Sequence, residues 1–158
     1  MFAVVGQKWN KLDGKTFLRV SCFKRGNFMT DAETPLVLYV EDEFLIRATV
    51  IDALEEAGYR VAVAKSGAEA VSLLAEHDAD IRGLVTDIDL GQGIDGWEVA
   101  HTAREAVSGL PVVYVSAASQ HDWTSRGVPE SIMIAKPFAT AQVVVAISSL
   151  ITSSDLQT

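Results

Sequence analysis

The sequence predicts an α/β fold in which helices cover both faces of a doubly wound five-stranded parallel sheet, giving three layers. After residue 35, short apolar segments alternate five times with segments of helical periodicity. The short segments carry apolar residues at consecutive positions, which is typical of strands buried on both faces of a parallel sheet. Glycine or proline separates several of these segments. Together, these three observations favour a (βα)5 arrangement.

The elements are predicted in chain order from this pattern. Strands are expected at 36–40, 60–64, 82–87, 112–115 and 132–135, and helices at about 43–57, 66–76, 96–107, 120–126 and 139–151. Gly58 fits a left-handed cap after the first helix. Ser66 and Glu69 have the spacing of a capping box at the start of the second. Residues 153–158 are left as a tail.

One folded domain over residues 34–152 accounts for most of the 158 residues, of which 49% are hydrophobic. Residues 1–33 form an N-terminal extension with six basic and three acidic side chains. This extension is a disordered arm, a strand-forming segment, or sequence upstream of the true start, since Met29 is a plausible beginning. The remainder has seven basic and eighteen acidic side chains. Such an acidic domain disfavours nucleic-acid binding.

The composition also bears on localisation. Cys22 is the only cysteine, so no intramolecular disulfide is possible. The sequence contains no apolar run of membrane-spanning length and no basic segment before its first apolar residues. We therefore expect a cytoplasmic protein with no membrane partner.

Polar side chains stand where four of the predicted strands end. Glu41 and Asp42 follow the first strand, Asp87 ends the third, Ser116 follows the fourth and Lys136 follows the fifth. Ligands bind at the carboxyl edge of parallel sheets, so we expect these residues to form one compact site. Either acid of the first pair also fits the N-cap of the first helix.

The residue types at these strand ends indicate phosphoryl chemistry. Carboxylates as close as Glu41, Asp42 and Asp87 raise one another's pKa unless a cation lies among them. Oxygen ligands without a histidine or cysteine cluster favour Mg²⁺ or Mn²⁺ over zinc. The Lys136 ammonium suits phosphate oxygens, and Ser116 can donate a hydrogen bond to the same group. The set therefore predicts a site that makes and breaks an aspartyl phosphate.

With these motifs, the segment from about 35 to 151 resembles the receiver domains of two-component response regulators, which have a flavodoxin-like or CheY-like fold. The resemblance implies that Asp87 is the phosphoacceptor. It implies that Asp42 and Asp87 are direct Mg²⁺ ligands, that Glu41 acts through metal-bound water, and that the backbone carbonyl of Asp89 completes the protein ligands.

The same resemblance assigns roles to the later strand ends. Ser116 corresponds to the switch hydroxyl, and Ala117 to the small residue that leaves access to the phosphoryl group. Lys136 binds the phosphoryl group, and Pro137 follows it through an expected cis peptide bond. Gly96 has a structural role at a helix start.

Three features depart from the family pattern. The loop after Asp87 contains Gly91-Gln92-Gly93, lacks the usual proline and is one residue longer, so it is expected to be more mobile. The Asp89 side chain adds a negative charge that is predicted to alter the dephosphorylation rate. Met133 replaces the usual aromatic residue, so switching by an aromatic rotamer is not available.

The leading functional interpretation is a single-domain response regulator of a two-component phosphorelay. It accepts a phosphoryl group from a histidine kinase or histidine phosphotransfer protein and signals through protein binding, with a homodimer through the last two helices as one option. It is not an enzyme beyond slow autodephosphorylation. Met133 motivates an alternative, a phosphorylation-independent receiver-like binding module. The Asp87-Ile88-Asp89 motif motivates another, a small aspartyl-phosphate phosphatase similar to those of the haloacid dehalogenase class.

Overall fold

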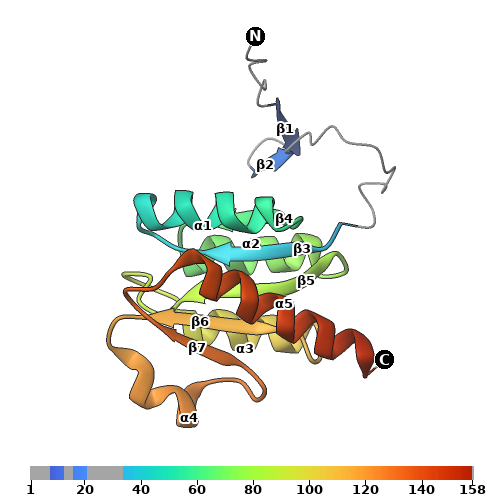
Figure 1. Cartoon of the computed structure of the whole chain (residues 1–158). Coiled ribbons are helices and arrows are strands. Elements are labelled where there is room, and N and C mark those ends of the chain that lie inside the picture. Colours follow the sequence, from blue (N-terminus) through green and yellow to red (C-terminus); the bar gives the residue numbers. More distant parts are fainter. Residues whose placement is uncertain (1–7, 13–15, 21–33, 158) are drawn as a thin grey trace.

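The computed structural model describes residues 8–12, 16–20 and 34–157 (Figure 1). In the N-terminal extension, β1 (Lys8–Leu12) pairs antiparallel with β2 (Thr16–Val20). This hairpin agrees with the strand-forming alternative for that part of the extension. The rest of the extension lies outside the described residues, and its place in the natural chain stays a prediction.

The main domain contains one five-stranded parallel sheet. Its strands are β3 (Leu36–Val40), β4 (Arg60–Ala64), β5 (Ile81–Asp87), β6 (Val112–Ser116) and β7 (Ile132–Ala135). Their order across the sheet is β4-β3-β5-β6-β7, with every neighbouring pair parallel. This order confirms the predicted doubly wound sheet.

The helices form the outer two layers. They are α1 (Phe44–Glu56), α2 (Gly67–His77), α3 (Gly96–Ala106), α4 (Trp123–Arg126) and α5 (Thr140–Leu156), with a 3-10 turn, η2 (Ser119–Asp122), before α4. In Figure 1, α1 and α5 lie in front of the sheet, and α2 and α3 lie behind it. No helix in residues 34–157 is long and apolar enough to cross a membrane.

Side chains of alternate strand residues pack into two separate hydrophobic cores, one on each face of the sheet. Leu38 and Val40 belong to the cluster shared with α2 and α3, whereas Val37 and Tyr39 belong to the cluster shared with α1 and α5. All four of these side chains are buried. The uninterrupted apolar strands in the sequence therefore have a simple cause, since neither face of the sheet meets water.

The last helix is longer than the sequence pattern predicted. It continues to Leu156, so the assignment of residues 153–158 to a tail was wrong for 153–156. Its polar end carries one hydrogen bond from Ser153 Oγ to the Ser149 carbonyl, 2.9 Å, and an ion pair of 2.7 Å between Arg82 and Asp155. Neither contact follows the apolar periodicity on which the prediction relied.

The helix caps agree with the sequence in part. Gly58 has a φ of +95°, as the predicted left-handed position requires. Ser66 Oγ accepts from the Glu69 N–H, but the Glu69 carboxylate accepts from the Lys65 N–H, so only half of the predicted capping box forms. The N-cap of α1 is Glu43, without a side-chain cap bond, so Glu41 and Asp42 do not cap that helix.

Gly96 lets α3 begin directly against the end of β5. A Cβ atom at this position would collide with the Asp87 carbonyl oxygen and with Ile88 Cα. Asp95 caps the same helix through a reciprocal capping box with Glu98. The close approach places the helix start immediately behind the predicted phosphoacceptor.

We expect Gly96→Ala to lower the free energy of unfolding by about 3 kcal/mol, because the added methyl group must displace backbone atoms. Gly91→Ala is the control: its Cβ would meet no atom, and only its left-handed backbone, φ +79°, makes it unfavourable, at about 1 kcal/mol. Urea unfolding of the three proteins measures both values. An equal loss in the two variants would contradict the close approach.

Candidate functional site

The fold brings the polar strand ends to one edge of the sheet, as predicted. Glu41 follows β3, Asp87 ends β5, Ser116 ends β6 and Lys136 follows β7. Backbone bonds continue past the strand ends and fix these positions. The Glu41 N–H donates to the Ala64 carbonyl, 3.1 Å, and the Lys136 N–H donates to the Ser116 carbonyl, 2.9 Å.

Lys136 forms ion pairs with two buried carboxylates. Its Nζ lies 2.6 Å from Asp87 Oδ2 and 3.1 Å from Glu41 Oε2. Glu41 is 1% exposed and Asp87 is 3% exposed. The Lys136–Pro137 peptide bond is cis, which confirms that prediction. One ammonium therefore contacts acids from two different strands.

The charges of this group are not balanced. Burial and the nearby negative charge of Asp87 raise the pKa of Glu41 from 4.5 to about 7. Burial alone would lower the pKa of Lys136, but its hydrogen bond and charge interaction with Asp87, followed by those with Glu41, raise it. Lys136 thus stays protonated and contacts two acids, so the site carries excess negative charge once Glu41 is ionised.

The acidic residues fit a divalent cation. Carboxylate oxygens of Glu41, Asp42 and Asp87 all lie within 4.8 Å of one another. Asp42 is exposed while the other two are buried, so the group opens toward solvent on one side. Hard oxygen ligands combined with an excess of negative charge match the requirements of Mg²⁺. The residues predicted from the sequence are therefore brought together in a suitable arrangement.

The Asp87 carboxylate is held by two donors. Asp87 Oδ2 accepts from Lys136, and Asp87 Oδ1 accepts from the Asp89 N–H at 3.0 Å. Thr86 Oγ1 donates to the Asp87 carbonyl at 2.8 Å. These contacts fix the direction of the carboxylate at the strand end.

Ser116 is fully buried beside this group. Its Oγ accepts from the N–H groups of Ala118, 3.2 Å, and Ser119, 2.8 Å, and lies 3.4 Å from Asp89 Oδ2. Ala117 is exposed, and its role in leaving access stays a prediction. The serine hydroxyl thus joins its own loop to the loop that follows Asp87.

Two contributors were missed by the sequence analysis. Arg47 of α1 donates from Nη1 to the carbonyls of Glu41, 2.9 Å, and Asp42, 3.0 Å, and so holds the turn that presents both acids. Gln120 Nε2 donates to the Ser116 carbonyl at 3.1 Å. Both bind backbone oxygens, and no motif in the sequence signals such contacts.

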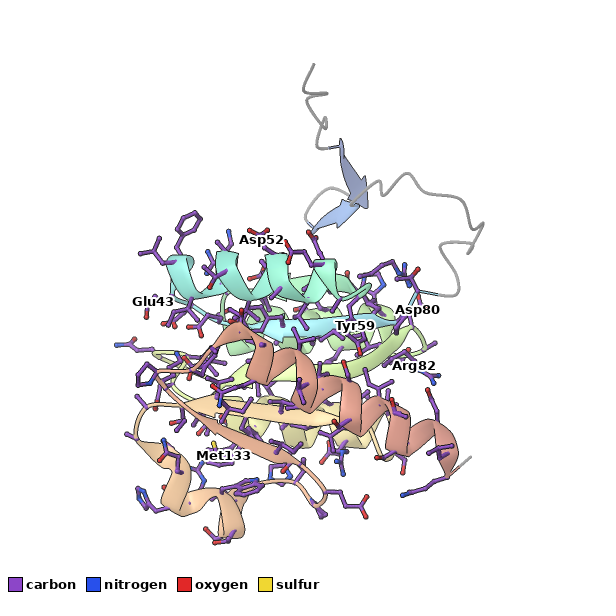
Figure 2. The ribbon with its side chains drawn as sticks, viewed as in Figure 1. Glu43, Asp52, Tyr59, Asp80, Arg82 and Met133 are labelled. Carbon is purple, nitrogen blue, oxygen red and sulfur yellow. The ribbon has the colours of Figure 1, made fainter. Side chains whose placement is uncertain are left out.

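Met133 has a packing position. It lies on β7 (Figure 2), is half-buried and packs against the core on the side of α2 and α3, as does Trp123. Trp97 is buried in the same core, with its ring centroid 4.7 Å from that of Tyr114. Met133, Trp97 and Trp123 therefore contribute to packing on this side of the sheet.

Fold and site together define a receiver domain, and comparisons with known proteins agree. The family model described as response regulator receiver domain matches residues 37–148. A response regulator receiver protein from Sinorhizobium medicae is 40% identical, with a TM-score of 0.74, over 77% of this chain and 97% of that chain. The chain therefore belongs to the response regulator receiver domain family of two-component systems.

Curated relatives extend this similarity to longer proteins. The transcriptional regulatory protein PdtaR of Mycobacterium tuberculosis is 34% identical over 124 residues, which cover 75% of this chain and 58% of that protein. The sensor kinase CckA of Brucella abortus is 27% identical over 75% of this chain and 13% of its own length. The chain thus spans 58% of the length of PdtaR and 13% of the length of CckA.

The raised pKa of Glu41 predicts a pH dependence. The folded state holds a proton on Glu41 up to about pH 7, whereas the unfolded chain releases it near pH 4.5, so stability declines as pH rises between these values. With a chelator present, the free energy of unfolding of the parent should fall by about 1 kcal/mol or more between pH 5 and pH 8. The free energy of unfolding of Glu41→Gln should fall by less over the same range.

Urea unfolding at both pH values measures this difference, with Glu56→Gln as an exposed control. Added Mg²⁺ should reduce the loss in the parent, because a cation stabilises the ionised carboxylate. The same pH dependence in the parent and in Glu41→Gln would contradict the assignment.

Proposed function

We propose that this protein is a single-domain response regulator that accepts a phosphoryl group on Asp87 from a histidine kinase or a histidine phosphotransfer protein. The supporting observation is the 2.6 Å contact between Lys136 Nζ and Asp87 Oδ2, within a group of carboxylates suited to a divalent cation. Anionic oxygens on a transferred phosphoryl group need such a cationic surrounding.

The transfer is an in-line displacement. A carboxylate oxygen of Asp87 attacks phosphorus, the bond between phosphorus and the donor imidazole nitrogen breaks, and the electron pair stays on that nitrogen. The Lys136 ammonium neutralises charge on the phosphoryl oxygens, and the Asp89 N–H orients the attacking carboxylate. Asp42, Asp87, Glu41 and the Asp89 carbonyl would hold Mg²⁺, which would supply further charge neutralisation.

The donor protein is expected to approach over the start of α1. Phe44 and Leu45 are 69% and 71% exposed and directly follow the acidic residues at the end of β3. Exposed apolar side chains of this size are typical of protein contact surfaces. Their position next to the site favours a protein donor over a small phosphorylated metabolite.

Output is proposed to occur through protein binding in the cytoplasm. Val145 on α5 is 64% exposed, which supports a partner surface there, including a homodimer through the last two helices. We assign no enzymatic turnover beyond slow autodephosphorylation. The acidic domain gives no support for nucleic-acid binding by this region.

A phosphorylation-independent binding module is the second candidate. Its supporting observation is Met133, which packs in the core where an aromatic switch residue is usual in the family. In that case, partner binding would be the same for the parent and Asp87→Asn.

The decisive experiment is the intact mass of the protein after treatment with acetyl phosphate and Mg²⁺. We expect one phosphoryl adduct in the parent and none in Asp87→Asn or in the presence of chelator. Asp80→Asn is the matched control, because Asp80 is exposed and lies at the opposite end of the molecule from Glu43 (Figure 2).

An adduct that survives in Asp87→Asn would contradict the assigned acceptor. Steady release of phosphate with repeated turnover would favour the phosphatase alternative. A parent protein without adduct or turnover would favour the binding module.

A further inference from the structure

Asp89 connects the predicted phosphoacceptor with Ser116. Its N–H donates to Asp87 Oδ1 at 3.0 Å, and its Oδ2 accepts from Ser116 Oγ at 3.4 Å. The Asp89 side chain is exposed, whereas Ser116 is fully buried. One residue therefore touches the reacting carboxylate through its backbone and the buried hydroxyl through its side chain.

The hydrogen-bonding capacity of Ser116 is fully used in this arrangement. A serine hydroxyl has one proton to donate and two lone pairs that accept. The N–H groups of Ala118 and Ser119 occupy the lone pairs, and the proton is directed to Asp89. While these contacts persist, Ser116 has no proton for a phosphoryl oxygen on Asp87.

We propose that Asp89 is a positioning residue that holds the Ser116 hydroxyl in the resting state and releases it when Asp87 is phosphorylated. This inference rests on the proposed function. Phosphoryl oxygens carry more charge than a carboxylate and compete for the same proton. They also repel the Asp89 carboxylate. After phosphorylation, the Ser116 hydroxyl therefore donates to a phosphoryl oxygen instead of to the Asp89 carboxylate.

A second contact joins the same two loops farther from the reacting carboxylate. Arg126, at the end of α4, lies 3.0 Å from Asp95 Oδ2, with its guanidinium 5.5 Å from the centre of the Trp97 ring. The segment from Ser116 to Arg126 is thus held at both ends by the segment from Asp89 to Trp97. Release at Ser116 leaves the contacts of Arg126 in place.

The competing explanation is that the Asp89 charge acts directly on the phosphoryl group or on attacking water. Two substitutions separate these effects. Asp89→Asn removes the charge and keeps an oxygen acceptor, whereas Asp89→Ala removes both. Neither changes the backbone carbonyl of residue 89. Each is made in the parent and in Ser116→Ala, which gives a double-mutant cycle.

The measured quantity is the lifetime of the phosphoryl adduct formed with acetyl phosphate and Mg²⁺. In proteins that keep Ser116, we expect the Asp89→Ala adduct to live about two- to tenfold longer than the Asp89→Asn adduct, because its hydroxyl is free to hold the phosphoryl group. In the Ser116→Ala background, this ratio should fall to about one.

A ratio that persists without the Ser116 hydroxyl, or a ratio of one in its presence, would overturn the role of Asp89. Absence of any adduct in the parent is a different result, since it overturns the proposed function itself.

A second readout does not need the Ser116 variant. The amide resonances of Ala118 and Ser119 should shift when the parent is phosphorylated. In unphosphorylated Asp89→Ala, these resonances should lie between the positions of the unphosphorylated and the phosphorylated parent. In unphosphorylated Asp89→Asn, they should stay near the positions of the unphosphorylated parent. Identical resonances in the two unphosphorylated variants would contradict the release of Ser116.

Discussion

The contacts of Lys136 with Asp87 and Glu41 hold the functional edge of the sheet together. Lys136 follows β7, whereas the two acids belong to β5 and β3, so one ammonium spans the strand ends on which the site depends. Both carboxylates are buried, and either one would be costly to keep ionised without this partner. The position of Lys136 in turn depends on its backbone bond to Ser116.

When Glu41, Asp42 and Asp87 are all ionised, this arrangement holds more negative than positive charge. That excess favours the binding of a cation. Two buried acids and the exposed Asp42 face one lysine, and burial together with Asp87 raises the pKa of Glu41 to about 7. A site adapted only for stability would match its charges. An excess of acid next to solvent instead suits a cation and a transferred anion, which arrive together in phosphoryl transfer.

The sequence was sufficient to predict the sheet and the polar residues that follow its strands at one edge. Apolar strands ending in Glu41, Asp87, Ser116 and Lys136 define the edge, because parallel strands must present these ends on one side. The contact between Asp89 and Ser116 was not predictable. It depends on the path of two loops and on side-chain rotamers, neither of which follows from spacing along the chain.

Local polar contacts account for the remaining differences between prediction and structure. Glu69 bonds to Lys65 instead of completing the capping box with Ser66, and Arg47 binds backbone carbonyls that no motif marks. The end of α5 past Ile151 carries hydrogen bonds from the Thr152 and Ser153 hydroxyls to carbonyls one turn earlier, and the ion pair of Asp155. Apolar periodicity carries no information on such contacts, since it reports only which residues face the core.

We expect Asp87 and Asp42 to bind a divalent cation, with Lys136 competing for the Asp87 carboxylate. A calorimetric titration of the whole chain with Mg²⁺ tests it most directly. We predict one binding site, weakened about tenfold or more in Asp42→Asn and strengthened in Lys136→Met, because removing the ammonium leaves Asp87 more negative. Unchanged affinity in Asp42→Asn, or weaker binding in Lys136→Met, would contradict this account.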